Sequence, residues 1–499
     1  MPATPDKVAS QALVDTSGTQ LAKAIEPITR GHSGEAGVVA LADGRDAFAS
    51  RVLLARAAER SIDLQTYIFH ADATGTLMFD ELRRAADRGA RVRLLLDDNN
   101  TGGMDPLLAL VDAHPNIELR LFNPFANRGS RLVGYATDFS RLNRRMHNKS
   151  FTVDNQATVV GGRNIGDEYF EAGQGTSFAD LDVVAVGDVV REVSTLFDRY
   201  WNSPSAYPAA TLLVGVEPMA DATFRAQVQK VRDSAEAAAY LRALERSPQV
   251  QDLLAGRPQI EWAAARLVFD EPEKVLNPPE RVDLQLLPKL QESFGLARDG
   301  VDLVSPYFVP GDAGTEALAT LARRGVRVRV LTNSLAATDV AAVHAGYAKR
   351  RKDLLRAGVQ LFELKPSAET AAAQRSKGGG SGGLGGSSGG GNSKASLHAK
   401  TFSVDRSRLF VGSFNLDPRS ARLNTEMGMV IDSPRLAAQL SGALDRIAPD
   451  AAYEVKLSPD GQLQWLDSGG VVHTTEPQSG LVRRSLVEVF SWLPIEWLL

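Results

Sequence analysis

The chain has 499 residues, 43% of them hydrophobic, and a formal net charge of −4 at pH 7. This length suits two or more domains, and this hydrophobic content suits ordinary cores rather than disorder. An acidic balance argues against a nucleic-acid partner, because nucleic-acid-binding surfaces are usually strongly basic. The chain has no cysteine, which excludes disulfides, thiolate metal sites and a lipid-modified cysteine anchor.

The N-terminal segment MPATPDKVASQALVD lacks the apolar core of a signal peptide. No stretch of the sequence reaches the ~18 consecutive apolar residues that a membrane-spanning helix needs. We therefore expect a protein that is soluble or attached to a membrane surface.

In chain order, the sequence predicts one structural unit that occurs twice. The first copy is a strand over 61–69, a helix over 77–90 and a strand over 92–98. The second copy is a strand over 301–308, a helix over 316–325 and a strand over 326–333. Strands that alternate with helices favour parallel pairing and an α/β layer architecture. We therefore predict two related α/β/α domains with mixed, largely parallel sheets.

The predicted division places an N-terminal domain at 1–215 and a C-terminal domain at 280–499. The segment between them, 216–279, is rich in alanine and charged residues and is predicted to be a helical connector. A Gly/Ser-rich tract at 377–394 has no means of packing. It is either a linker or a mobile loop over the site that follows it.

The strongest signal is a motif, H-x-K-x-x-x-x-D with a later asparagine, that occurs twice at identical offsets. The first copy consists of His147, Lys149, Asp154 and Asn164, and the second of His398, Lys400, Asp405 and Asn415. One copy could arise by chance, but two copies inside a repeated α/β unit are a strong signal.

Each copy has the pattern of a β-hairpin. Apolar and polar residues alternate after the histidine, so His and Lys at i and i+2 would lie on one face of a strand. The aspartate would lie in the turn, because a second β-like run follows it. Gly161, Gly162 and Gly412 would let the backbone approach the ligand that the imidazole holds.

The doubled motif resembles the phospholipase D superfamily over most of the chain. The sequences DDNNTGG at 97–103 and HAGYAKRRKDLLRAGVQLFEL at 344–364 narrow the resemblance to the bacterial cardiolipin synthases, most like their C-type members. The resemblance implies two phospholipase D-like domains related by a pseudo-twofold axis, with the two motifs meeting at their interface. The Gly/Ser-rich tract departs from the family pattern.

The resemblance also implies covalent catalysis through a phosphohistidine, without a metal or other cofactor. By the family's usual order, His147 would be the nucleophile and His398 the general acid and then the base; the residues alone leave this order open. Lys149 and Lys400 would hold the phosphate oxygens, aided by Asn164 and Asn415.

Each histidine also needs a partner that fixes its tautomer. We expect Glu426 to serve His398 and Asp180 to serve His147. The motif residues Asp154 and Asp405 favour hydrogen bonds within the turn region, with tuning of the site as the alternative.

Two further segments suggest contact with substrate or membrane. His344 and Tyr347, in the segment that resembles the synthases, are candidate substrate-binding residues. The C-terminal segment 481–499 combines Trp492, Trp497 and several leucines with two arginines, a mixture suited to a membrane interface. The alternative for this segment is a helix packed on the protein body.

The expected function is a phosphatidyltransferase that makes cardiolipin from phosphatidylglycerol and a second phospholipid, either phosphatidylglycerol or phosphatidylethanolamine. We expect phospholipid substrates, no nucleic-acid partner, and a peripheral location on a bacterial membrane; the sequence leaves any protein partner open. If water replaced the lipid acceptor, the same residues would make a phospholipase D. A nuclease of the superfamily and a non-catalytic lipid-binding protein are further alternatives.

Overall fold

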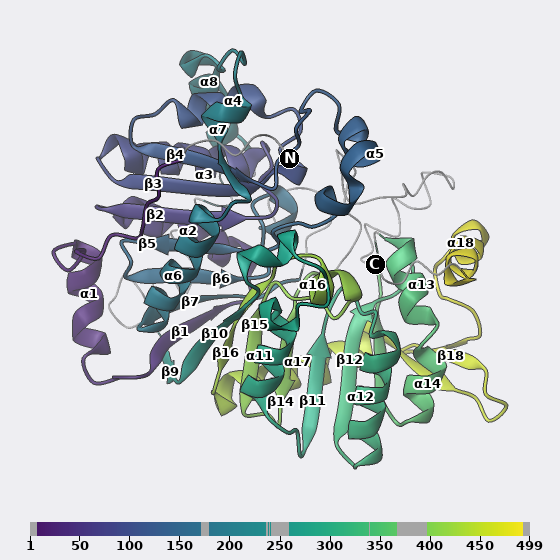
Figure 1. Cartoon of the computed structure of the whole chain (residues 1–499). Coiled ribbons are helices and arrows are strands. Elements are labelled where there is room, and N and C mark those ends of the chain that lie inside the picture. Colours follow the sequence, from purple (N-terminus) through teal and green to yellow (C-terminus); the bar gives the residue numbers. More distant parts are fainter. Residues whose placement is uncertain are drawn as a thin grey trace.

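The computed structural model describes residues 7–170, 179–235, 238, 240, 259–338, 340–366 and 397–492. The chain forms two halves, each built around one large β-sheet that carries helices (Figure 1). The Gly/Ser-rich tract and residues 493–499 of the C-terminal segment lie outside the described residues.

The first half contains a nine-stranded sheet in the order β8-β4-β3-β2-β5-β6-β7-β1-β9. Its strands are β1 Ala36–Leu41, β2 Ser61–Thr66, β3 Arg91–Asp97, β4 Ile117–Phe122, β5 Ser150–Val153, β6 Ala157–Gly161, β7 Asp182–Gly187, β8 Ala206–Pro208 and β9 Glu261–Ala263. The helices that precede β9 are α1 Gln20–Thr29, α2 Gly44–Ala57, α3 Ala73–Asp87, α4 Asp105–Asp112, α5 Arg131–Leu142, α6 Val189–Asn202, α7 Ala209–Leu212 and α8 Asp221–Arg232.

The second half contains a ten-stranded sheet in the order β10-β16-β15-β14-β11-β12-β13-β17-β18-β19. Its strands are β10 Ala265–Phe269, β11 Gly300–Val304, β12 Arg327–Asn333, β13 Gln360–Leu364, β14 Thr401–Val404, β15 Arg408–Gly412, β16 Met427–Ile431, β17 Ala452–Leu457, β18 Leu463–Leu466 and β19 Val472–His473. Its helices are α11 Leu286–Phe294, α12 Gly311–Arg323, α13 Ala341–Ala348, α14 Arg351–Arg356, α16 Pro418–Arg422, α17 Pro434–Ala451 and α18 Leu481–Trp492.

The repeated strand-helix-strand unit is confirmed as β2-α3-β3 and β11-α12-β12. A buried ion pair lies at the same register in both copies. Arg93 Nε of β3 donates to Asp63 of β2 over 2.7 Å, and Arg329 Nε of β12 donates to Asp302 of β11 over 2.7 Å. The duplication therefore extends from element order to individual side-chain contacts.

The sheets are mixed, as predicted, but the expectation that they are largely parallel is wrong. The pairs β2–β3, β3–β4, β11–β12 and β12–β13 are parallel. The other ladders between described strands are antiparallel. The reason is that each motif forms a hairpin, and a hairpin adds antiparallel strands to the parallel unit.

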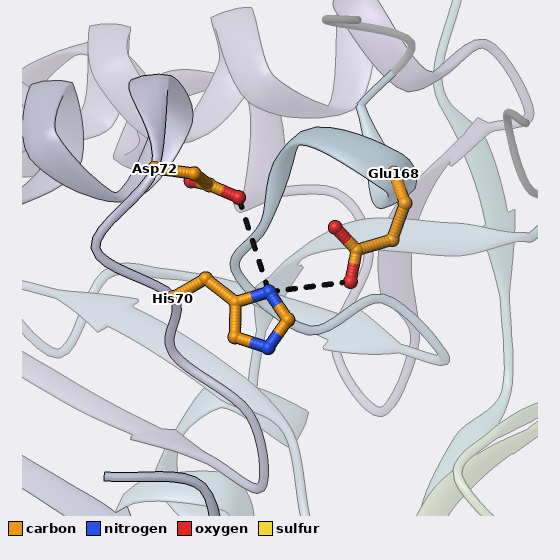
Figure 2. Close-up of side chains that lie close together, drawn as sticks. All are labelled: His70, Asp72 and Glu168. Carbon is orange, nitrogen blue, oxygen red and sulfur yellow. Dashed lines mark ion pairs between the residues drawn. The ribbon is translucent and has the colours of Figure 1, made fainter. Parts of the chain in front are cut away.

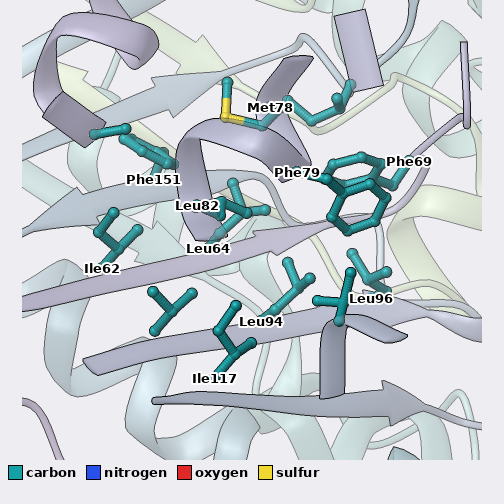
Figure 3. Close-up of a cluster of buried hydrophobic side chains, with 14 of the residues drawn as sticks. Ile62, Leu64, Phe69, Met78, Phe79, Leu82, Leu94, Leu96, Ile117 and Phe151 are labelled. Atoms are coloured by element: carbon teal, nitrogen blue, oxygen red, sulfur yellow. The ribbon is translucent and has the colours of Figure 1, made fainter. Parts of the chain in front are cut away.

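Helix α3 covers the centre of the first sheet and supplies much of its core (Figure 3). Its apolar residues recur at helical spacing, so one face is buried against the sheet. The labelled side chains in this cluster are Ile62, Leu64, Phe69, Met78, Phe79, Leu82, Leu94, Leu96, Ile117 and Phe151.

The two halves share a second hydrophobic cluster across their interface. It joins Met146 and Val160 of the first half to Val411, Met427 and Ile431 of the second. Burial of apolar surface stabilises such an interface at roughly 25 cal/mol per Å². The hairpins that carry the two motifs are therefore packed against each other.

The chain passes from the first sheet to the second over very few residues. Strand β9 ends at Ala263 and pairs with β1, and β10 begins at Ala265 and pairs with β16. Within 216–279 the described part contains the α-helix α8 and a 3-10 helix at Pro272–Leu276, and residues 236, 237, 239 and 241–258 lie outside the described part. In the part of the chain that is described, no helix is both long and apolar enough to cross a membrane.

Candidate active site

Two tight hairpins position the motifs, β5–β6 in the first half and β14–β15 in the second. Their turns place Asp154 and Asn155 at φ 50° and 51°, and Asp405 and Arg406 at φ 54° and 48°. Two successive residues with positive φ are the signature of a type I′ turn, which matches the twist of a hairpin. The histidine lies just before the first strand of each hairpin, and the aspartate lies just after it.

The motif aspartates lie at the opposite end of the strand from the histidines. Asp154 accepts hydrogen bonds from the backbone N–H groups of residues 59–61, at 2.8 to 3.1 Å. Asp405 accepts from those of residues 298–300, at 2.8 to 3.1 Å. Both aspartates therefore tie the hairpin turn to the start of the neighbouring parallel strand, β2 or β11. This placement supports a structural role rather than a direct catalytic one.

The histidines meet at the interface because each one pairs with backbone from the other half. His147 N donates to Thr425 O over 2.8 Å, and Met146 forms a β-bridge with Thr425. His398 N donates to Ala179 O over 2.9 Å, beside a bridge between Ala179 and Leu397. These contacts bring the two motifs into one site, as the doubled sequence predicted.

The expected pairing of histidines with acids is wrong, because the partners are exchanged. His147 Nδ1 lies 2.8 Å from Glu426 Oε2, and His398 Nδ1 lies 2.6 Å from Asp180 Oδ2. Glu426 directly follows the residue that bridges to Met146, and Asp180 directly follows the residue that bridges to Leu397. Each half therefore supplies the acid for the histidine of the other half.

The carboxylate of Glu426 is held by two hydroxyl groups. Ser413 Oγ donates to Oε2 over 2.5 Å, and Ser420 Oγ donates to Oε1 over 2.8 Å. Burial raises the pKa of Glu426 to about 7, although Lys149 and the two hydroxyls act in the opposite direction. From the sequence we expected Gly412 and Ser413 only to let the backbone approach the ligand closely, so we missed this role of Ser413, and we missed Ser420.

Asp180 has a different environment, which depends on a glycine. Gly162 occupies the position in the first copy that Ser413 occupies in the second. A Cβ atom at Gly162 would lie 2.3 Å from Asp180 Oδ1. We predicted that this glycine admits the ligand, but the space that it leaves is filled by Asp180. Burial opposes the charged form of Asp180, yet His398, Lys400 and Arg163 hold its pKa below the usual range.

The hydrogen bonds of His147 define its tautomer. Nδ1 also lies 3.1 Å from Ser413 O, and a carbonyl oxygen can only accept, so Nδ1 carries the proton. The lone pair of the neutral imidazole is then on Nε2. Burial lowers the pKa of His147 well below its ordinary value, and Lys149 and Lys400 lower it further. The neutral ring is therefore the stable form of His147 in the free protein.

Both motif lysines lie beside the histidines. Lys149 Nζ donates to His147 O over 2.6 Å, and Lys400 Nζ donates to His398 O and lies 3.0 Å from His398 Nδ1. Burial lowers the pKa of Lys149 to about 7, against the effect of Glu426. Burial, with Lys400, lowers the pKa of His398 to about 3, although Asp180 acts in the opposite direction. Burial thus penalises the charged forms of these side chains, a cost that an anionic ligand beside them would offset.

Each motif asparagine has one buried side-chain atom without a hydrogen-bond partner in the described structure. Asn164 Oδ1 accepts from Ile68 N over 3.2 Å, which fixes the amide, and its Nδ2 has no hydrogen-bond partner. In the second copy, Asn415 Oδ1 has none. Buried polar groups are normally satisfied, so an unpaired amide donor is suited to a ligand oxygen.

Two tyrosines that sequence reasoning missed lie edge-on to the histidines. The ring centroids of Tyr67 and His147 are 5.0 Å apart, and those of Tyr169 and His398 are 5.1 Å apart. Lys149 Nζ lies 5.7 Å from the centroid of the Tyr67 ring. The tyrosines fix the orientation of the imidazoles, but no spacing in the sequence links them to the motifs.

His344 and Tyr347 lie outside the catalytic cluster. His344 Nε2 lies 3.2 Å from Glu476, and Tyr347 Oη donates to Glu363 over 3.2 Å. Both line a small pocket with Asn333, whose side chain donates to Leu397 O over 3.1 Å, next to His398. Their role in substrate binding stays a prediction.

Among the described residues, two groups of side chains have the composition of a metal site. The buried group of His344, Glu363 and Glu476 is occupied by Arg351, which forms ion pairs of 2.9 and 2.6 Å with the two glutamates. The second group lies beside the motif loop (Figure 2), where His70 Nδ1 is 3.4 Å from Glu168 and 3.9 Å from Asp72. A hydrogen bond that Glu168 accepts raises the pKa of His70, which favours a protonated imidazole beside these acids.

This geometry agrees with comparisons to known proteins. Residues 53–201 and 290–448 match the family described as cardiolipin synthase, phospholipase D-like domain. These ranges contain both histidine motifs and most of both sheets. The chain therefore belongs to the phospholipase D-like family of cardiolipin synthases.

A curated relative, cardiolipin synthase C of Escherichia coli K12, is 47% identical over 485 residues, covering 96% of this chain and 100% of that protein. A cardiolipin synthase of Staphylococcus aureus is 24% identical over 413 residues, covering 80% of this chain and 65% of that protein. The crystal structure of phosphatidylserine synthase from Haemophilus influenzae has a TM-score of 0.61 at 13% identity, covering 95% of this chain and 100% of that one. This last similarity supports the fold alone.

Proposed function

We propose that this protein is a phosphatidyltransferase that makes cardiolipin from phosphatidylglycerol and a second phospholipid. The observation that carries the proposal is the crossed pair of dyads, His147–Glu426 and His398–Asp180, with a lysine beside each histidine. The similarity to cardiolipin synthase C over nearly the whole chain supports the substrate class.

The first step forms a covalent phosphatidyl-enzyme. The lone pair on Nε2 of neutral His147 attacks the phosphorus of the donor lipid, and a phosphorus–nitrogen bond forms. The bond from phosphorus to the head-group oxygen breaks, and that oxygen takes a proton from Nε2 of His398. Lys149, Lys400 and Asn164 stabilise the charge that develops on the non-bridging oxygens.

In the second step His398 acts as a general base instead of a general acid. His398 Nε2 accepts the proton of a glycerol hydroxyl of phosphatidylglycerol, and the hydroxyl oxygen attacks the phosphorus. The phosphorus–nitrogen bond breaks, which releases cardiolipin and restores neutral His147. The proton that His398 gives to the leaving head group in the first step is replaced by the proton of the acceptor hydroxyl in the second.

The two acids favour this assignment of roles. Asp180 is anionic, since its pKa lies below the usual range, and an anion stabilises the protonated His398 that a general acid requires. Glu426 shares its charge with two hydroxyls and has a raised pKa, so His147 stays neutral and nucleophilic. The negative charge of a bound phosphodiester would offset the positive charges of both lysines. His398 could then take up a proton.

We also propose that helix α18 attaches the enzyme to a membrane surface. Its inner residue Val487 packs against Leu335 and Ala345. Its outer residues Leu481 and Val482 are 77% and 65% exposed. Both alternatives for this segment, a helix packed on the protein body and a helix at a membrane interface, can therefore hold together. One side of α18 packs on the body, and the other is open to a lipid interface.

The test is the conversion of phosphatidylglycerol vesicles, with and without phosphatidylethanolamine, followed by mass spectrometry of the lipids. We expect wild type to form cardiolipin and the His147→Ala and His398→Ala variants to form none. If cardiolipin forms only when phosphatidylethanolamine is present, phosphatidylethanolamine is the donor. Phosphatidic acid as the only product would instead establish a hydrolase. Equal cardiolipin from wild type and both variants would contradict the proposed site.

A further inference from the structure

We infer that helix α5, Arg131–Leu142, is a membrane-contacting element that holds the His147 side of the site against the lipid bilayer. This inference rests on the proposed function for the nature of the substrate. It adds a contact surface in the first half of the molecule, separate from α18 in the second.

The outer face of α5 is apolar and open. Leu132, Val133 and Phe139 are 83%, 50% and 46% exposed. Ala136 is exposed between them, and so are Thr137 and Ser140, so the fully exposed positions of this helix carry no charge. Leu132, Val133 and Ala136 lie before a kink at Asp138, where the backbone is non-helical, and Phe139 follows it. Exposed apolar side chains that gather on one short segment, rather than being scattered singly, mark an interaction surface.

The inner face of α5 is connected to the catalytic site. Tyr135 Oη donates to Asn99 Oδ1 over 2.5 Å, and Asn99 Nδ2 donates to Tyr67 Oη over 3.3 Å. The Tyr67 ring lies edge-on to His147 at 5.0 Å. Arg131 fixes the same loop by a hydrogen bond of 3.0 Å to Thr101. One side of α5 therefore faces solvent while the other supports the ring that contacts His147.

The position of α5 in the chain limits how far its last residue can lie from His147. The helix ends at Leu142, and five residues later the chain reaches His147. Five extended residues span at most about 18 Å. The phosphate of a membrane lipid lies directly above its acyl chains, so the surface that meets the bilayer must lie close to the residue that takes the phosphate.

The shape of the surface supports the same occupant. A hollow of about 370 Å³ opens beside the helix, lined by Val133, Leu142 and Ala126 together with Arg141. Its apolar walls suit an acyl chain, while Arg141 is paired with Asp138, which lines the same hollow. In Figure 1, α5 lies beside the first sheet and α18 beside the second, both to the right of the view. A bilayer could thus contact one helix from each half.

The test uses the full chain and sedimentation with sucrose-loaded vesicles of equal parts phosphatidylglycerol and phosphatidylcholine. The variant Leu132→Glu, Phe139→Glu should bind these vesicles at least about tenfold more weakly than wild type. The matched control is Val214→Glu, because Val214 is equally open, at 81%, and follows α7 far from α5 in the sequence. The control should bind as wild type does.

Turnover separates membrane contact from damage to the site. On dispersed short-chain phosphatidylglycerol the double variant should keep the wild-type rate, whereas on vesicles its rate should fall with its binding. Unchanged vesicle binding, or an equal loss in the Val214→Glu control, would overturn the inference. The inference would also be overturned if light scattering showed a dimer in wild type that dissociates in the double variant, while vesicle binding is unchanged. In that case α5 would bind a second copy of the chain.

The binding assay is independent of catalysis. If wild type binds the vesicles through α5 but forms no cardiolipin, the proposed function fails and the α5 surface stands. If cardiolipin forms and the double variant still binds, the α5 surface fails and the proposed function stands.

Discussion

Ser413 Oγ donates a 2.5 Å hydrogen bond to the Glu426 carboxylate that accepts from His147. The equivalent position in the first copy is Gly162, which leaves space for Asp180 beside His398. The two copies of the motif have the same spacing, yet their histidines pair with different acids. This difference favours a division of labour in which one histidine attacks and the other carries a proton.

Removal of one hydroxyl should disturb His147 without removing any reacting atom. Ser413→Ala should lower kcat by roughly tenfold, because a lost hydrogen bond to a buried charged group costs about 1.5–3 kcal/mol and part of this loss acts on the dyad. The acidic limb of the kcat profile should move to higher pH, since Glu426 loses a donor that lowers its pKa. A Ser413→Thr variant keeps the hydroxyl and should restore most activity. A profile that does not move in Ser413→Ala would mean that the serine only packs.

Filling the space at Gly162 should affect the other dyad. In Gly162→Ala the new Cβ would collide with Asp180, so the carboxylate must move away from His398. We expect kcat to fall about 10²-fold or more, in the range lost when a proton-transfer group is disabled. Gly442→Ala is a useful control, since that glycine lies in α17 of the other half and the nearest atom to a new Cβ there would be 3.5 Å away. Wild-type turnover in Gly162→Ala would contradict the role given to Asp180.

Lys149 should make substrate binding depend on pH near neutrality. Its pKa is lowered to about 7, so the ammonium form is present below that pH and is lost as the pH rises. Because the charged form holds the phosphate, kcat/KM on dispersed lipid should fall as the pH rises above about 7. Lys149→Arg should remove this dependence even if its activity is lower, because a guanidinium stays charged. The comparison of the two profiles is the measurement, and identical profiles would show that Lys149 does not titrate in this range.

Asp405 should stabilise the fold rather than the reaction. Asp405→Asn replaces a carboxylate that accepts several backbone N–H bonds and should lower the free energy of unfolding by about 1–3 kcal/mol. Backbone hydrogen bonds hold the pKa of Asp405 below its usual value, against the effect of burial. Its contribution is therefore present above the unfolded pKa and is lost as the pH falls through the folded pKa. Denaturant unfolding at pH 7 and pH 3.5 would test this. A large loss of kcat at unchanged stability would instead place Asp405 in the catalytic machinery.

The sequence by itself determined the elements that local patterns encode. The doubled motif, the hairpins with an aspartate in the turn, and the repeated strand-helix-strand unit all follow from alternation, helical spacing and turn chemistry. These are short-range properties, so they can be recognised in a single sequence. The convergence of His147 and His398 also followed from the repetition, through the resemblance to the phospholipase D superfamily.

Only the tertiary structure decided which acid meets which histidine and how the sheets pair. Glu426 and Asp180 cross the interface because Thr425 and Ala179 pair with backbone of the opposite half. Strand direction was mispredicted for a similar reason, since antiparallel pairs such as β1–β7, β10–β16 and β13–β17 join strands that are far apart in the sequence. The two tyrosines and Ser420 reach the site from other elements, Ser420 from helix α16. Contacts made across long sequence separations leave no local period, so the folded arrangement alone defines them.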